Sequence, residues 1–181
     1  SRISIDIALS RGGDQVVIKE GDNYEYFGGK SKATEKISKV RSRVISQALK
    51  RMVETSSKVF VMGHNNPDMD SFGSALGIYE GIKSIGKECY FVLNEVNKPI
   101  ENIYNRTVED LEGFRENVVT EIKALELMDQ GSLVIVTDNH RKNSTEAPSL
   151  IDRTEQIVII DHHRRGNDYI RNATISYIEP Y

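Results

Sequence analysis

The sequence has one cysteine and no hydrophobic run as long as a membrane span. Cys89 alone excludes an internal disulfide and a cysteine-based zinc site, and this usage fits a reducing compartment. Crossing a bilayer takes ~20 apolar residues, and neither such a run nor a signal-peptide pattern is present. The net charge of -3 argues against a non-specific binder of duplex nucleic acid. We therefore expect a soluble, cytoplasmic chain whose nucleotide partner, if it has one, is small.

The apolar patterns that are present predict an α/β fold. With 181 residues, 38% of them hydrophobic, the chain suits one domain or one domain plus part of another. We expect strands near 59–62, 88–94, 132–138, 156–163 and 173–178, separated by helical patterns at 71–84, capped by Ser71, and at 118–128. Alternating strands and helices favour a mostly parallel, doubly wound, Rossmann-like sheet.

The first 55 residues have a different character. Residues 3–10 predict a short helix, and residues 15–20 and 24–27 predict a hairpin joined by turn residues at 21–23. Residues 34–55 predict a long amphipathic helix, whose basic residues we interpret as a solvated face. Because the chain begins Ser1-Arg2 without a methionine, we expect a piece of a longer protein.

Three apolar runs end in possible metal ligands. In a parallel sheet, ligands bind just beyond the carboxyl ends of the strands, so side chains released there converge on one site. The candidates are His64, Asp68 and Asp70 after the first run, Asp138 after the second, and Asp161, His162 and His163 after the third. Each cluster alone is a weak signal, since a single Asp after a strand is usually a turn residue or a helix cap. Their conjunction predicts a metal site.

These residue types suit a centre of two divalent ions. Imidazole and carboxylate ligands favour Mn²⁺ over a thiolate-type metal, and Asp138 is placed to bridge the pair. One histidine of the 162–163 pair could ligate the second ion while the other faces substrate, and Asp161 could orient a ring. Such a centre polarises a phosphoryl group and activates water, which indicates phosphoester or phosphoanhydride hydrolysis. The sequence also offers Arg141, Arg164 and Arg165 for the substrate phosphate, or simply as solvated loop charges.

Three segments resemble the motifs of the DHH phosphoesterase family. They are GHNNPDMDSFGSALG at 63–77, VIVTD at 134–138 and VIIDHHRRG at 158–166. Together with the upstream RGGDQVVIK and YFGGKS, they are most similar to the GdpP/YybT type of cyclic di-AMP phosphodiesterase, in which membrane helices, a PAS domain and a degenerate GGDEF domain precede the DHH part. The resemblance implies His64 and Asp68 on the first metal, Asp70 and His162 on the second, Asp138 between them, and His163 on phosphate or nucleophile.

The same resemblance implies a domain plan and an activity. Residues 1–30 would end the degenerate GGDEF domain, 31–55 would be a linker helix, and 56–181 a DHH domain incomplete at its C-terminus, without the fourth motif and the substrate lobe. The parent protein would be membrane-anchored with its catalytic part in the cytoplasm, compatible with a homodimer, and would hydrolyse cyclic di-AMP to linear pApA. Two alternatives stay open. One is another DHH activity, namely nanoRNase or pAp phosphatase, RecJ-type exonuclease or pyrophosphatase. The other is a regulatory module without catalysis.

Overall fold

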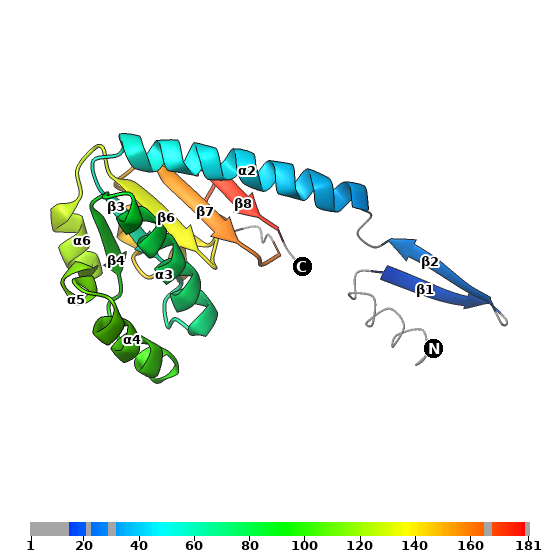
Figure 1. Cartoon of the computed structure of the whole chain (residues 1–181), viewed down its shortest axis with the longest axis horizontal. Coiled ribbons are helices and arrows are strands. Elements are labelled where there is room, and N and C mark those ends of the chain that lie inside the picture. The colour runs from blue at the N-terminus through cyan, green and yellow to red at the C-terminus, as the bar shows by residue number, and fades with distance from the viewer. Residues whose placement is uncertain (1–14, 21–22, 29–31, 165–167, 180–181) are drawn as a thin grey trace. The chain divides into compact units, whose positions relative to one another are not determined.

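The computed structural model describes residues 15–20, 23–28, 32–164 and 168–179, with side chains described from Arg41 onward (Figure 1). The chain divides into two compact units, Ser1–Ser46 and Gln47–Pro180. The helix expected over 3–10 lies outside the described residues. No helix in the described ranges is both long enough and apolar enough to cross a membrane.

The first unit contains the predicted hairpin. Strands β1 (Gln15–Glu20) and β2 (Asn23–Gly28) pair antiparallel, with Gln15 opposite Gly28 and Glu20 opposite Asn23. The helix α2 (Lys32–Thr55) follows and continues into the second unit, close to the predicted range. Its last turns pack Leu49, Met52 and Val53 into the core of that unit, as expected for an amphipathic helix.

The second unit is built on one six-stranded sheet in the order β5-β4-β3-β6-β7-β8, with all its pairings parallel. Its strands are β3 (Val59–Met62), β4 (Cys89–Val92), β5 (Val118–Val119), β6 (Leu133–Thr137), β7 (Ile157–Asp161) and β8 (Ile175–Ile178). The chain builds one half outward from β3 and then the other half outward from β6. This is the doubly wound α/β architecture that the sequence predicted, and its topological switch point lies between β3 and β6.

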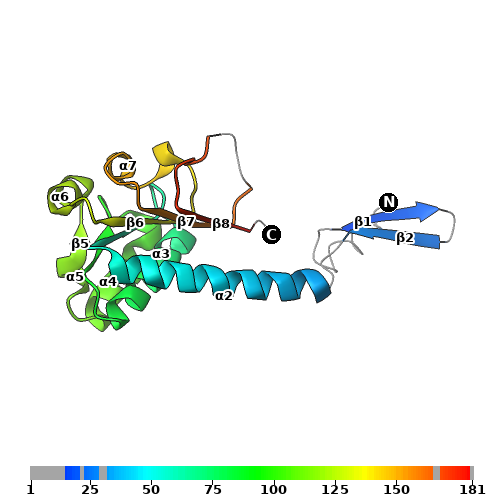
Figure 2. The ribbon, with the colours of Figure 1, turned by 90° about the horizontal axis from the view of Figure 1, so that it is seen from above.

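Helices cover both faces of the sheet (Figure 2). The end of α2 with α3 (Met69–Ser84), α4 (Lys98–Asp110) and α5 (Phe114–Asn117) lies on one face, and α6 (Glu121–Leu127) with α7 (Pro148–Ile151) on the other. Successive strand residues alternate between the two cores: Val59 and Val61 pack on the first, Phe60 and Met62 on the second. Burial on both faces explains why these strands are apolar runs without alternation.

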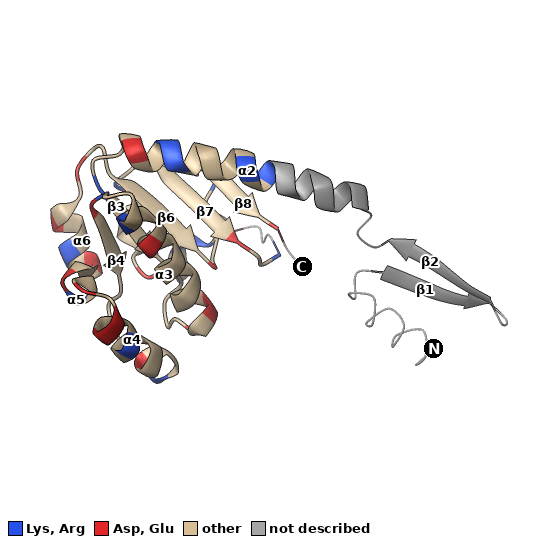
Figure 3. Cartoon of the chain, viewed as in Figure 1, with Lys and Arg blue, Asp and Glu red and all other residues tan. Residues whose placement is uncertain are grey.

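The charged residues lie mainly on helices and loops in the described part of the chain (Figure 3). Within the six strands of the sheet the sole charged residue is Asp161, the last residue of β7. The strands of this sheet therefore carry no charged residue except at their carboxyl ends, where burial of a charge is least costly.

The structure corrects two local predictions. The segment 118–128 is not one helix, because Val118 and Val119 add a short strand to the sheet edge and the Thr120 hydroxyl caps α6 by accepting from the Lys123 amide at 3.4 Å. The cap of α3 is Asp68 rather than Ser71, since Asp68 Oδ1 accepts from the Ser71 amide at 2.9 Å. Because α3 begins at Met69, its N-cap lies three residues before the predicted one.

Candidate metal centre

His64 is fixed by the loop that leaves β3. Its backbone amide donates to the Ser71 hydroxyl at 3.0 Å, and its Nδ1 lies 2.8 Å from the Asn65 carbonyl oxygen. A carbonyl can only accept, so Nδ1 carries the proton and Nε2 keeps its lone pair. That Nε2 lies 3.7 Å from Asp68 Oδ1 and 3.7 Å from Asp138 Oδ2. This is the arrangement in which a histidine is oriented through one nitrogen and offers a metal the other.

Gly63 permits this close packing of loop and helix. A Cβ at this position would lie 2.0 Å from the Ser71 Oγ, which is buried and holds the His64 amide. A side chain there would force the start of α3 away from the loop, so the glycine between β3 and His64 has a steric reason.

Asp68 both caps the N-terminus of α3 and offers a carboxylate oxygen to the candidate metal site. Its Oδ1 accepts from the amides of Asp70 at 3.0 Å and Ser71 at 2.9 Å. The hydrogen bond from the Ser71 amide is the main reason that the pKa of Asp68 lies below its ordinary value. A carboxylate has about four acceptor positions, so the capping bonds leave room for a cation. The aspartate is thus held ionised at the positive end of α3.

Asp138 lies at the centre of the group. It follows β6, its φ is 54°, and its amide donates to the Ile160 carbonyl on β7 at 2.9 Å. A non-glycine residue in this left-handed region is strained, and such strain is concentrated at functional sites. Its two carboxylate oxygens face different partners: Oδ2 faces His64, and Oδ1 lies 3.1 Å from His162 Nε2. Burial raises the pKa of Asp138.

The residues near Asp138 form two overlapping groups that could hold a metal ion. His64, Asp68 and Asp138 offer ligand atoms that all lie within 4.8 Å of one another, and so do Asp138, His162 and His163. Asp70 is close to the second group, since its Oδ2 lies 3.7 Å from His162 Nε2. The structure thus brings together the residues of all three predicted strand ends, with Asp138 shared between the two groups.

His163 differs from His162 in what its ring contacts. Its Nδ1 lies 2.8 Å from Asp161 Oδ1, and its backbone amide donates to the same oxygen at 3.1 Å. This hydrogen bond raises the pKa of His163 and leaves Nδ1 protonated, so that within the group with Asp138 and His162 this ring could offer a metal only its Nε2. Asp161 is held ionised in turn: its burial acts against this, but bonds from His140 and His163 bring its pKa below the ordinary value.

His140 is a site residue that the sequence did not single out. It follows Asp138 by two positions, it is 2% exposed, and its Nδ1 hydrogen-bonds to Asp161 Oδ2. A histidine in a polar loop carries no periodic or spacing signal. The pairing with a residue 21 positions later exists only once β6 and β7 lie side by side.

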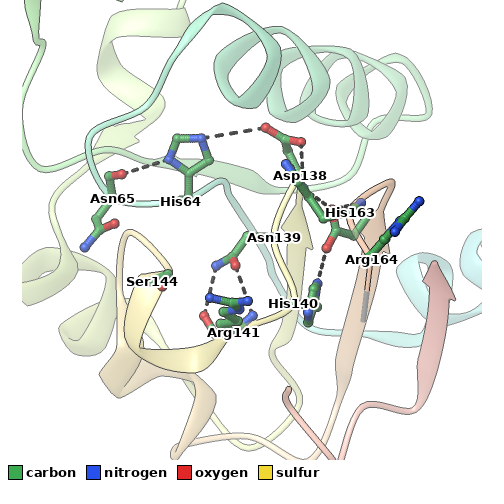
Figure 4. A pocket seen from close by; sticks show the side chains of 10 residues that line it. His64, Asn65, Asp138, Asn139, His140, Arg141, Ser144, His163 and Arg164 are labelled. Atoms are coloured by element: carbon green, nitrogen blue, oxygen red, sulfur yellow. Dashed lines mark hydrogen bonds and ion pairs between the residues drawn. The ribbon is translucent and has the colours of Figure 1, made fainter. Parts of the chain in front are cut away.

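A cavity of about 380 Å³ adjoins these residues (Figure 4). Its lining includes His64, Asp138 and His163, together with Asn65, Asn139 and Ser144. Two of the three predicted phosphate-binding arginines, Arg141 and Arg164, also line it, and Arg165 lies outside the described residues. The Asn139 side chain holds the backbone of Arg141 by accepting from its amide at 3.0 Å and donating to its carbonyl at 2.9 Å. The Arg141 Nε also lies 3.3 Å from Asp168 Oδ1, an exposed pair of small energetic weight.

Comparison with known proteins identifies the family of this chain. Residues 58–181 match the DHH family, N-terminal domain. The chain belongs to the DHH family. It is 39% identical over 181 residues to the cyclic-di-AMP phosphodiesterase PdeA of Listeria monocytogenes, covering 98% of this chain and 27% of the relative. It is 38% identical over 181 residues to the cyclic-di-AMP phosphodiesterase GdpP of Bacillus subtilis, again covering 98% of this chain and 27% of the relative.

A solved structure shares the fold. The crystal structure of an exopolyphosphatase-related protein from Bacteroides fragilis matches with a TM-score of 0.54 and 18% identity, over 74% of this chain and 38% of that one. This likeness concerns the fold alone. The chain spans about a quarter of the length of its phosphodiesterase relatives, 27% in both cases.

Proposed function

We propose that this chain forms the metal-binding part of a phosphodiesterase that opens cyclic di-AMP to linear pApA with the help of two divalent ions, Mn²⁺ being the expected metal. The observation that carries the proposal is Asp138, whose two carboxylate oxygens face His64 and His162 from opposite metal-capable groups. His64 and Asp68 would hold one ion, Asp70 and His162 the other, and Asp138 both.

The donor set fits two such ions. It consists of imidazole nitrogens and carboxylate oxygens without any thiolate, which suits Mn²⁺ and disfavours a structural zinc site. The buried Asp138 carboxylate has a pKa raised by its removal from water. A cation on each of its oxygens would relieve that cost, because a buried charge is tolerated when it is paired or coordinates a metal.

The residues around this centre have separate tasks in the proposed reaction. When bound, the two ions supply polarisation of the phosphoryl group and activation of a water molecule. Asp161 holds the His163 ring through Nδ1, so that the other ring nitrogen can meet a phosphate oxygen or the leaving group. Arg164 and Arg141 line the adjoining cavity and can pair with phosphate charge.

The similarity to the relatives supports a cyclic dinucleotide as the substrate, and the cavity volume is compatible with small-molecule substrates in general. The relatives PdeA and GdpP, which are named as cyclic-di-AMP phosphodiesterases, align with 98% of this chain. The cavity of about 380 Å³ beside the metal-capable groups lies within the usual range for small-molecule sites. Membrane anchoring of the parent protein, the GGDEF origin of residues 1–30 and a homodimer stay predictions.

Metal binding is tested by calorimetric titration of the chain with Mn²⁺. We expect two ions per chain in the wild type, at most one in the His64→Ala variant, and a large loss of affinity for both in Asp138→Asn. The matched control is Asp110→Asn, which removes an exposed carboxylate paired with Arg106 on α4. Equal affinity in Asp138→Asn and the wild type would exclude the shared-carboxylate centre.

Activity is tested by incubating the full-length parent protein with cyclic di-AMP and Mn²⁺ and separating the nucleotides by chromatography. We expect pApA from the wild type and none from Asp138→Asn. Parallel incubations with pAp, a short oligoribonucleotide and pyrophosphate test the other activities of the family. Cleavage of one of these in preference to cyclic di-AMP would overturn the substrate assignment while leaving the metal centre in place.

A further inference from the structure

Asp161 is held between two histidines. Its side chain is 0% exposed, its Oδ1 accepts from the backbone amide and Nδ1 of His163, and its Oδ2 accepts from His140 Nδ1. Both histidines line the cavity, but their rings differ in exposure: the His163 side chain is 56% exposed and the His140 side chain is 3% exposed. One carboxylate thus joins a buried imidazole to an exposed one.

We propose that His140 is a positioning residue: it holds the Asp161 carboxylate in place, and through this carboxylate it fixes the orientation and tautomer of the His163 ring. This role in phosphodiester hydrolysis rests on the proposed function.

The physical reason lies in the freedom of the groups involved. An Asp carboxylate rotates easily about its last torsion, and an imidazole can be flipped or can change tautomer. Hydrogen bonds to Asp161 Oδ1 alone would leave that rotation open, while a second bond to Oδ2 from a buried ring closes it. With Asp161 fixed, His163 keeps its proton on Nδ1 and presents Nε2 to the cavity side.

His140 is itself anchored at several points. Its carbonyl accepts from the Ile170 amide at 2.8 Å, and its loop is attached to β6, which pairs with the strand that carries Asp161. The carbonyl of Asp161 accepts from the Glu179 amide at 3.1 Å, which fixes the other end of the contact. The backbone on both sides of the His140–Asp161 bond is therefore held by neighbouring segments, and side-chain rotation is the freedom that the bond removes.

A purely structural role for His140 predicts different behaviour. A buried polar pair that serves only packing can be replaced by an apolar residue of similar size without any effect on a third, exposed side chain. The proposal instead requires that the loss of the His140 donor be felt at His163. The two views are separated by a variant that keeps the donor and one that removes it.

The test compares His140→Asn with His140→Leu in the full chain. Asn keeps an N–H donor close to the position of Nδ1, and Leu fills the space without a donor. The first readout is the histidine side-chain ¹⁵N NMR spectrum, recorded with Mg²⁺ so that no paramagnetic ion broadens it. We expect His163 to show a single Nδ1-protonated tautomer in the wild type and in His140→Asn, and a mixture in His140→Leu. Thermal unfolding shows whether each variant is folded.

The second readout is kinetic. We expect kcat for cyclic di-AMP to fall about 10- to 100-fold in His140→Leu, with KM and Mn²⁺ affinity unchanged, and to be restored in His140→Asn. Asp161→Asn combined with His140→Leu should be no worse than Asp161→Asn alone, because both changes break one chain of contacts. An unchanged His163 tautomer in folded His140→Leu would overturn the proposal. Since this spectrum needs no turnover, a parent protein that failed to cleave cyclic di-AMP would contradict the proposed function and still allow the positioning role to be decided.

Discussion

Asp138 Oδ1 lies 3.1 Å from His162 Nε2, although the two residues belong to different strand ends. The contact places the buried Asp138 carboxylate beside an imidazole nitrogen. Within the described part of the chain, the ion-pair partners of this carboxylate are histidines and not Lys or Arg. Such a carboxylate is a cost to the metal-free fold and an advantage to the metal-bound one. We therefore expect the stability of the protein to depend on bound metal, and we expect a substitution of Asp138 to remove this dependence.

We expect Asp138→Asn to uncouple stability from metal. Without metal the variant should be at least as stable as the wild type, because burial raises the pKa of Asp138 and disfavours its charge. With Mn²⁺ at 100 times its dissociation constant, the wild type should gain about 2.7 kcal/mol of unfolding free energy, and the variant far less. Chemical denaturation with Mn²⁺ and with EDTA measures both. Equal gains in the two proteins would contradict the central place of Asp138.

We expect Gly63→Ala to damage the site through Ser71. The added Cβ would lie 2.0 Å from the Ser71 Oγ, so either the His64 loop or the start of α3 must move. The unfolding free energy should fall by about 1–3 kcal/mol, as for overpacking of a close contact, and Mn²⁺ affinity should fall with it.

The matched control is Gly77→Ala, within the helix α3 that carries Ser71. A Cβ at Gly77 would meet nothing within 4 Å, and the residue is exposed. Because glycine is unfavourable in helix interiors, this change should stabilise the protein by about 0.5–1 kcal/mol with no effect on metal binding. If both substitutions had the same effect, the steric account of Gly63 would be wrong.

We expect Glu146→Gln to change the pH dependence of stability. Burial raises the pKa of Glu146, whose Oε1 accepts from the Asn94 amide at 2.6 Å. A raised folded pKa means that the favourable contribution of this group is complete below its unfolded pKa of about 4.3 and is lost as the pH rises through the folded value. The Gln variant keeps an acceptor and has no charge to bury. As the pH rises above about 4.3, the unfolding free energy of the variant should therefore increase relative to that of the wild type, as measured by urea denaturation. Parallel curves for the two proteins would argue against the shift.

We expect Cys89 to be unreactive in the folded protein. It is 0% exposed in β4, and burial raises the pKa of its thiol to about 12. Since the thiolate is the reactive form, a chromogenic disulfide reagent at about pH 8 should label the native chain only as fast as it opens, and the denatured chain at once. Because the folded pKa is raised, any stability tied to this thiol is lost only at alkaline pH, from about 8.5 upward. Rapid native labelling would place Cys89 at an accessible position instead.

The strand ends illustrate what sequence reasoning can reach. Val59–Met62 and the two later apolar runs are strong local patterns, and the residues that follow each run are ligand types. Parallel strands meet at one edge, so their convergence follows from the architecture alone. The start of the helix within 118–128 could not be predicted from the sequence, because Val118 and Val119 directly precede good helix formers and fit the first turn of the same helix. Pairing with β4 decides otherwise.

The sequence by itself determined the doubly wound parallel fold, the DHH motifs and the set of candidate ligands, because hydrophobic period and residue chemistry are local properties. The tertiary structure decided which atoms meet. It gave the helix cap to Asp68, turned the two oxygens of Asp138 toward different histidines, and joined His140 to Asp161 across neighbouring strands. Such contacts depend on backbone torsions and on strand register, which are fixed only when distant parts of the chain pack together.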